Sequence, residues 1–173
     1  MAGLPISRRD LLVAAGTASL AATGVTQAQT SQKGPGRVFT NPLDVKIADP
    51  CMIRADAAYY LYGTASMPED ANDGMPVWSS PDMVRWQCHG WAWRKSPETW
   101  GTHWFWGPDV QRVGESYLMY YGAFRKADGK DVGRICVARS ASPLGPFTDV
   151  KAPMFDWPNR GDAIDAFVYE DAD

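Results

Sequence analysis

The sequence predicts an all-β protein of repeated units, a β-propeller, and three observations favour this class. After residue 39 no stretch shows sustained helical periodicity. Short runs rich in aromatic and β-branched residues alternate instead with Gly, Pro, Asn and Asp, the composition of strands separated by turns. These runs recur about every 60 residues, which is the size of a four-stranded propeller blade.

Each predicted unit has two inner strands joined by a polar turn, followed by an outer segment with a second turn. These parts are residues 49–54, 59–63 and 79–86 in the first unit, and residues 108–113, 117–121 and 140–147 in the second. A third unit opens with residues 164–169. The repeat aligns Asp49, Asp109 and Asp165 at the start of the innermost strand of successive units.

The chain ends within this third unit, because residues 170–173 form a polar turn that leads toward a second strand. Two blades and one strand cannot close a ring, and closure is what removes exposed sheet edges in this architecture. We therefore expect the 173 residues to be a partial propeller, about two blades plus the start of the third.

The N-terminal region is expected to lie outside the propeller. Residues 1–28 have the features of a twin-arginine export signal, an arginine pair followed by an apolar stretch at 11–22. That stretch is shorter than the ~20 residues that cross a bilayer. Residues 29–38 have the composition of a linker, and residues 39–173 form the predicted domain. We expect a periplasmic or secreted protein with no membrane contact after signal removal.

Composition and charge narrow the class of partner. The formal charge of −3 and the pI near 5.3 exclude the basic surface typical of nucleic-acid binders. Eight Trp residues favour a carbohydrate partner, although Trp also fills the cores of all-β folds. The three cysteines allow at most one disulfide and match no zinc pattern, so we expect small buried apolar residues at Cys51, Cys88 and Cys136.

The repeated aspartates suggest chemistry at the propeller axis. Inverting hydrolysis of a glycosidic bond needs a carboxylate base and a carboxylic acid roughly 6.5–9.5 Å apart. A propeller brings equivalent positions of successive blades, here Asp49, Asp109 and Asp165, around one axis. The alternative is that an Asp beside Pro simply shapes a turn.

Several motifs of the chain resemble those of one known family. They are residues 41–43, 48–50 and 59–62 in the first unit, 106–110, 134–140 and 145–147 in the second, and 163–165 in the third. In this order and at these intervals they resemble glycoside hydrolase family 43, a family of five-bladed β-propeller glycosidases. The chain resembles the N-terminal portion of that family's domain.

The resemblance implies roles for the aspartates. Asp49 would be the general base, and Asp165 would orient the general acid and modulate its pKa. The acid, a Glu in the fourth blade, is expected after residue 173. Asp109 would be structural or substrate-adjacent. The family usually has Pro where this sequence has Ala166, which restores one N–H donor and frees one φ angle.

Other candidates come from residue type and position. Trp104, Phe105 and Trp106 precede the second innermost strand and would either lie next to the substrate or pack between blades. His89 and His103 have no second ligand at metal spacing, so we expect surface or hydrogen-bonded histidines. No cofactor is expected to be required, and a structural calcium is possible without assignable ligands.

The resemblance therefore implies an inverting glycoside hydrolase for arabinose- or xylose-containing plant polysaccharides or oligosaccharides. The α-L-arabinofuranosidase, endo-arabinanase and β-xylosidase types all remain open. As 173 residues without the acid, the chain is expected to be inactive. The alternatives are an inactive or sugar-binding propeller fragment, and a related five-bladed family that acts on fructans or mannosides.

Overall fold

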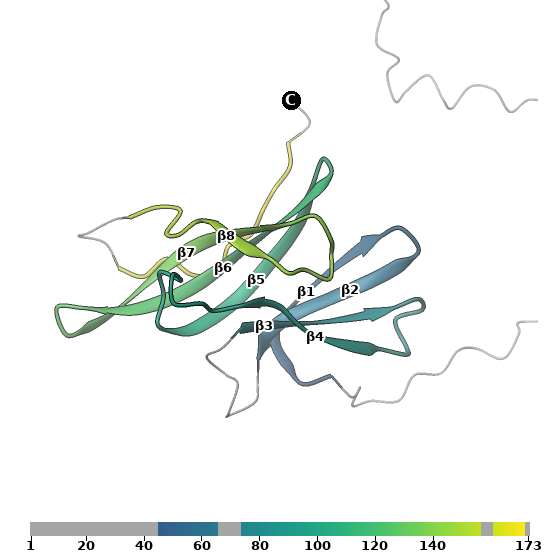
Figure 1. The fold of residues 1–173 in the computed structure, drawn as a ribbon, viewed down its shortest axis with the longest axis horizontal. Coiled ribbons are helices and arrows are strands. Elements are labelled where there is room, and N and C mark those ends of the chain that lie inside the picture. Colours follow the sequence, from purple (N-terminus) through teal and green to yellow (C-terminus); the bar gives the residue numbers. More distant parts are fainter. Residues whose placement is uncertain (1–44, 66–73, 157–160, 172–173) are drawn as a thin grey trace, which may run out of the picture. The chain divides into compact units, whose positions relative to one another are not determined.

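The computed structural model describes residues 45–65, 74–156 and 161–171. The predicted export signal, the linker and the motif at 41–43 lie outside these residues. Within them the chain forms eight strands in two four-stranded antiparallel sheets (Figure 1). No described segment forms a helix with the length and hydropathy needed to span a bilayer.

Each sheet follows the order of the chain, as a propeller blade does. The first contains β1 (Ile47–Ala55), β2 (Ala58–Ala65), β3 (Gly74–Ser80) and β4 (Gln87–Arg94), and the second contains β5 (His103–Val113), β6 (Ser116–Ala127), β7 (Lys130–Ser140) and β8 (Thr148–Lys151). The first strand of the second sheet, β5, contacts β1, β2 and β3 of the first. The two sheets are therefore consecutive blades whose first strands are neighbours.

The longest hairpin joins β6 to β7 through a two-residue turn. Its central residues, Asp128 and Gly129, have φ values of 49° and 75°. Two successive positive φ values are what a type I′ turn requires, and Asp-Gly is a preferred sequence for it. The turn keeps the ladder in uninterrupted register from Ala127–Lys130 to Tyr117–Ser140.

The register of the first strands corrects the predicted repeat by two residues. The ladder between β1 and β2 is interrupted just before Cys51, and that between β5 and β6 just before Asp109. The two interruptions are bulges at the same place in each blade. The counterpart of Asp109 in the first blade is therefore Cys51, and the counterpart of Asp49 in the second blade is Gly107.

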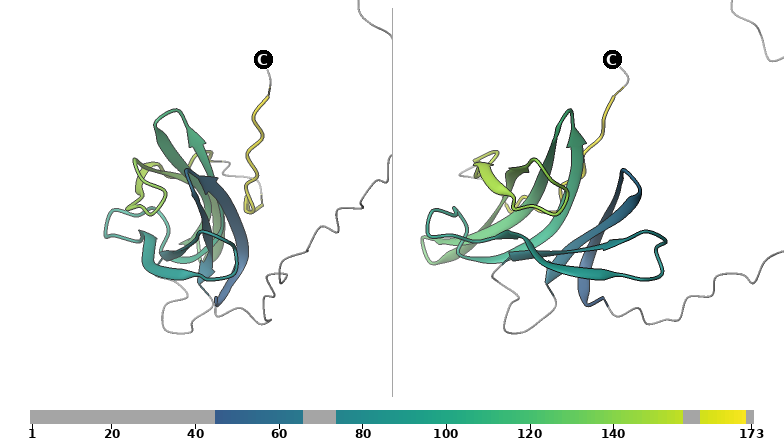
Figure 2. Two further views of the ribbon diagram at one scale, coloured as in Figure 1. Left: turned by 90° about the vertical axis from the view of Figure 1, so that its right-hand side faces the viewer. Right: turned by 45° about the vertical axis from the view of Figure 1, so that its right-hand side comes forward.

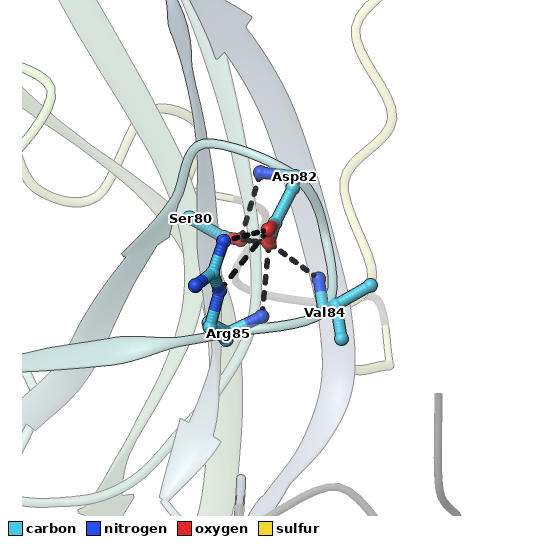
Figure 3. A network of polar contacts seen from close by, with 4 residues as sticks. All are labelled: Ser80, Asp82, Val84 and Arg85. Carbon is cyan, nitrogen blue, oxygen red and sulfur yellow. Dashed lines mark hydrogen bonds and ion pairs between the residues drawn. The ribbon is translucent and has the colours of Figure 1, made fainter. Parts of the chain in front are cut away.

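The turn between β3 and β4 is organised by one carboxylate (Figure 3). Asp82 Oδ1 accepts the backbone N–H groups of Val84 and Arg85, each at 3.0 Å, and Oδ2 accepts the Arg85 guanidinium at 2.9 Å. These bonds, led by the backbone N–H of Arg85, hold the pKa of Asp82 well below its usual range. Asp82 is thus a turn residue and takes no part in the candidate site.

The second blade builds the same turn with a different side chain. Ser80 Oγ accepts the N–H of Asp82 at 3.2 Å, and Ser140 Oγ accepts the N–H of Ser142 at 3.1 Å. Ser142 Oγ in turn accepts the N–H of Leu144 at 3.2 Å. The recurrence of this bond pattern supports the assignment of both sheets to one repeated unit.

Aromatic side chains fill the contact between the blades. Trp93 of β4 lies 4.9 Å from the ring of Phe105 in β5 and 4.6 Å from that of Tyr121 in β6, measured between centroids. All three side chains are buried. Asp149 of β8 accepts both the Trp93 indole N–H and the Tyr121 hydroxyl on one oxygen at 2.8 Å. The outer strands are therefore joined by a polar contact beside an apolar core.

The cysteines do not all have the predicted environment. All three thiols are free, but only Cys136 is buried, Cys51 is half-buried and Cys88 is exposed. Cys88 lies on the exposed part of β4, whose pattern is buried only at Ala92 and Trp93. The prediction of a small buried apolar residue is therefore correct for Cys136 and wrong for Cys88.

Residues 161–171 follow the second blade without joining a sheet (Figure 2). The predicted strand at 164–169 is absent here, because no described segment supplies a ladder partner for it. Hydrogen bonds hold this segment against the second blade instead. Asp162 Oδ1 accepts the N–H of Gly133 at 2.8 Å, the N–H of Ala163 donates to the Gly133 carbonyl at 3.1 Å, and the N–H of Val168 donates to Asp109.

Candidate active site

A hollow of about 460 Å³ is lined by all three aspartates that the sequence analysis singled out. Its wall comes from the start of β1, the start of β5 and the segment after the second blade. The lining includes Asp49, Gly107, Asp109, Asp165 and Phe167. Residues far apart in sequence thus meet at one place, because each belongs to the beginning of its own repeated unit.

Asp49 enters the hollow from the bulge of β1. Its φ of 48° is in the left-handed region, which Asp tolerates better than most residues but which still stores backbone strain. The side chain is exposed. One oxygen, Oδ2, accepts the hydroxyl of Thr64 at 2.7 Å. Asp49 is therefore a solvent-accessible carboxylate with one anchored oxygen.

Asp165 enters the hollow beside Gly107. It is also exposed and has a left-handed φ of 57°. Gly107 has a φ of 54°, and a Cβ built on it would lie 3.0 Å from Asp165 Oδ1. Such a contact is tighter than side chains normally make, so the glycine leaves the space that this carboxylate occupies. Asp49, Gly107 and Asp165 thus share one backbone conformation in successive units.

Asp109 differs from the other two in burial and in hydrogen bonding. It is only 9% exposed. Oδ2 accepts the N–H of Val168 at 2.7 Å, and Oδ1 accepts the Gln111 amide at 3.2 Å and the thiol of Cys51 at 3.6 Å. Its acceptors are thus directed at three segments of the chain. This arrangement joins the neighbouring units and is consistent with the predicted structural role.

Cys51 lines the hollow as a polar residue, which the sequence interpretation missed. Its sulfur accepts the N–H of Val110 at 3.3 Å and donates to Asp109. Burial is the main cause that raises the pKa of the Cys51 thiol to about 11. The thiol is therefore neutral near pH 7 and acts here as a hydrogen-bonding group.

The three aromatic candidates do not line this hollow. Phe105 is fully buried and packs against Trp93 of the first blade. Trp104 is 39% exposed, has a φ of 51° and stacks on Trp106 at 5.5 Å between centroids. Trp106 also packs on Phe124 at 4.9 Å. The two indoles form a platform whose outer member faces solvent.

The histidines are hydrogen-bonded, as predicted. His89 Nε2 lies 2.7 Å from Ser79 Oγ, and His103 Nε2 lies 2.8 Å from Asp131 Oδ1. Asp131 also binds Lys126 at 2.7 Å, and this bond is the main cause that lowers the pKa of its carboxyl. In the described ranges no group of three or more His, Cys, Asp or Glu side chains could hold a metal ion.

The hollow thus combines the exposed carboxylates of Asp49 and Asp165 with the buried carboxylate of Asp109, both of whose oxygens accept hydrogen bonds. An exposed Asp49 anchored through one oxygen can accept a proton from water with the other. Asp165 places a second negative charge on the same wall, where a like charge disfavours ionisation of a neighbouring acid. This division of roles suits general acid–base chemistry on an uncharged substrate.

The family model described as Glycosyl hydrolases family 43 matches residues 39–173. The chain belongs to glycoside hydrolase family 43. Its two sheets are blades of the five-bladed β-propeller of this family, and the chain covers part of that fold. The resemblance found in the motifs is thereby confirmed.

Relatives within family 43 differ in what they act on. Beta-D-galactofuranosidase xynD of Aspergillus niger is 29% identical over 135 residues, which are 73% of this chain and 39% of that protein. A thermostable family-43 glycoside hydrolase of known structure is 39% identical with a TM-score of 0.66, over 78% of this chain and 42% of its own. A β-xylosidase/α-arabinofuranosidase from a compost microbial metagenome, solved with xylotriose, is 30% identical with a TM-score of 0.52, over 64% and 36%.

The chain spans about two-fifths of the length of these relatives. The sequence interpretation assigned no role to Gly107, which lines the hollow, or to Thr64, which is hydrogen-bonded to two of its lining residues. Thr64 lies in the second strand of its unit and has no motif around it. Gly107 could have been matched with Asp49, because each precedes a Pro, but the two residue types differ.

Proposed function

We propose that the complete protein is an inverting glycoside hydrolase in which Asp49 is the general base. The observation that carries the proposal is that Asp49 and Asp165 line one hollow and are both exposed there. Membership of a family whose relatives are glycosidases supports the reaction class. Anchoring of one Asp49 oxygen leaves the other available to water.

The proposed reaction needs one further group. A water molecule in the hollow loses its proton to Asp49 as it attacks the anomeric carbon. A carboxylic acid on the opposite side protonates the departing glycosidic oxygen. We propose that this acid is a Glu of the fourth blade, after residue 173, and that Asp165 orients it and keeps it protonated. The 173 residues alone are accordingly proposed to be inactive.

The proposed substrates are oligosaccharides or polysaccharides that contain arabinose or xylose. One relative is named a β-xylosidase/α-arabinofuranosidase, which supports this class. Another is named a β-D-galactofuranosidase, so a galactofuranoside is included as a competitor in the test. We also propose export through the twin-arginine route, because plant polysaccharides are met outside the cell.

The test uses the protein that carries the whole propeller. Release of 4-nitrophenol is measured from the α-L-arabinofuranoside, the β-D-xyloside and the β-D-galactofuranoside, with the wild type and with Asp49→Asn. We expect turnover of an arabinoside or xyloside and loss of about 1000-fold or more in kcat for Asp49→Asn, because general-base catalysis contributes about 10²–10⁴-fold. Asp56→Asn, an exposed turn residue of the β1–β2 hairpin, is the matched control. Retained turnover in Asp49→Asn would remove this residue from the mechanism.

A further inference from the structure

The strongest unassigned feature of the hollow is a buried hydroxyl behind Asp49. Thr64 lies in β2, its side chain is only 7% exposed, and it belongs to no motif of the family resemblance. It nevertheless touches both sides of the hollow. Its contacts are with Asp49 of the first blade and with the backbone of Gly107 in the second.

We propose that Thr64 is a positioning residue that holds the general base and sets its place relative to Asp165. This inference rests on the proposed function, since it assigns a role to a neighbour of Asp49. It adds a residue that acts through another and does not itself meet the substrate.

The two hydrogen bonds of Thr64 have defined directions. The N–H of Gly107 can only donate, so at 2.9 Å it occupies a lone pair of Thr64 Oγ1. The hydroxyl proton is then free to point at Asp49 Oδ2, 2.7 Å away. The backbone of the second blade thereby fixes Thr64 as a donor. A donor aimed at Oδ2 restrains the orientation of the Asp49 carboxylate and leaves its other oxygen free of this bond.

Gly107 lies next to both Thr64 and Asp165. The same residue whose N–H holds Thr64 also leaves the space for Asp165, because a Cβ there would lie 3.0 Å from Asp165 Oδ1. Gly107 therefore holds Thr64, which binds Asp49, and also leaves space for Asp165. Thr64 is thus hydrogen-bonded to Asp49 and to Gly107, and Gly107 leaves open the space that Asp165 Oδ1 occupies.

The strained backbone of Asp49 explains why such a support is needed. Its φ of 48° lies in a region that a non-glycine residue occupies at a cost, and it sits in a bulge where the ladder is interrupted. An exposed carboxylate on this backbone has few other restraints. Loss of the hydroxyl would leave its chemistry intact but its orientation undefined.

The test compares Thr64→Val with Thr64→Ser in the protein that carries the whole propeller. Val keeps the shape and removes the hydroxyl, whereas Ser keeps the hydroxyl. We expect kcat on the preferred 4-nitrophenyl glycoside to fall about 10-fold or more in Thr64→Val with KM within about twofold, since misplacement of a catalytic group by an ångström costs about 100-fold. Thr64→Ser should stay within about threefold of the wild type.

Three outcomes overturn the inference or separate it from the proposed function. Wild-type kcat in Thr64→Val, or a Ser variant as slow as the Val variant, would show that the hydroxyl does not position the base. If Asp49→Asn is inactive while Thr64→Val is fully active, only the inference fails. If Asp49→Asn turns over, the proposed function fails first. Should Thr64→Val not fold, Thr64→Ala is compared with Thr64→Ser by the same measurements and with the same criteria.

Discussion

Replacement of Asp109 by Asn tests whether this carboxylate joins the blades or takes part in proton transfer. The native side chain only accepts: Oδ2 from the N–H of Val168 at 2.7 Å, and Oδ1 from the Gln111 amide at 3.2 Å and the Cys51 thiol at 3.6 Å. An Asn side chain keeps the acceptor for Val168 but turns an NH2 group toward Gln111 and Cys51. Both of these can reorient, Gln111 by exchange of its amide oxygen and nitrogen.

The expected cost follows from the change in bond strength. A hydrogen bond to a charged acceptor contributes about 1.5–3 kcal/mol, against about 1 kcal/mol for a neutral one. Asp109→Asn should therefore lower the free energy of unfolding by about 1–2 kcal/mol. Asp109→Ala also leaves the N–H of half-buried Val168 without its acceptor, so a larger loss of about 3 kcal/mol is expected.

Urea unfolding and steady-state kinetics of the whole-propeller protein provide the assay. A positioning role predicts that kcat of Asp109→Asn falls by about 10-fold or less, because the segment around Asp165 loses one charged tether. An unfolding free energy equal to that of the wild type, combined with a loss of activity as deep as that of Asp49→Asn, would refute this reasoning. It would indicate that Asp109 itself transfers a proton.

Three other changes have defined outcomes. Gly107→Ala should lower the free energy of unfolding by about 1–2 kcal/mol, because Ala is strained at this left-handed φ. It should also lower kcat, because the new Cβ would lie 3.0 Å from Asp165 Oδ1, and an unchanged kcat would contradict this crowding. Trp93→Phe should lower the free energy of unfolding, measured in urea, by about 2–3 kcal/mol, because the hydrogen bond from its indole N–H to the Asp149 carboxylate is lost. Asp149→Asn retains an acceptor for that N–H, so its free energy of unfolding should fall by less. Burial raises the pKa of Cys136 to about 12 from 9.0, so the folded state holds this proton more tightly and stability is lost as pH rises above 9, by ~1.4 kcal/mol per pH unit. Cys136→Ala should flatten the fall in unfolding free energy between pH 9 and pH 11, and an unchanged slope would count against the buried thiol.

The sequence was sufficient to predict the inner hairpin of each of the first two units and the existence of a repeat. The hairpins that join β1 to β2 and β5 to β6 were recognisable because short apolar and aromatic runs flank a polar turn. The two outer turns repeat because short polar side chains at the same positions cap the same backbone groups. These are local signals, and local signals can be recognised without the fold.

The register of the innermost strands was predicted two residues out of place, for a physical reason. The prediction matched Asp49 with Asp109 by residue type. In the structure the prolines are the equivalent positions, so that Asp49 matches Gly107 and both have a left-handed backbone. The same bulge occurs in both blades, so the repeat follows the backbone, whereas the acidic residue lies at the left-handed position in the first blade and two residues later in the second.

The contacts of Thr64 could not be predicted from the sequence, and packing of Phe105 between blades was only one of two alternatives. Thr64 reaches Gly107 across 43 residues of sequence and a blade boundary, which only the packing of the two sheets defines. Phe105 lies between exposed Trp104 and half-buried Trp106, and aromatic residue type alone does not show which of the three rings is buried.

The configuration of the first sugar released tests the central claim, direct attack by water activated at Asp49, more directly than any rate. Proton NMR of the whole-propeller protein acting on an oligosaccharide substrate distinguishes the two anomers before mutarotation mixes them. Inversion predicts that the first product has the anomeric configuration opposite to that of the bond cleaved. A first product with the configuration of the substrate would indicate a covalent intermediate and would contradict the role given to Asp49.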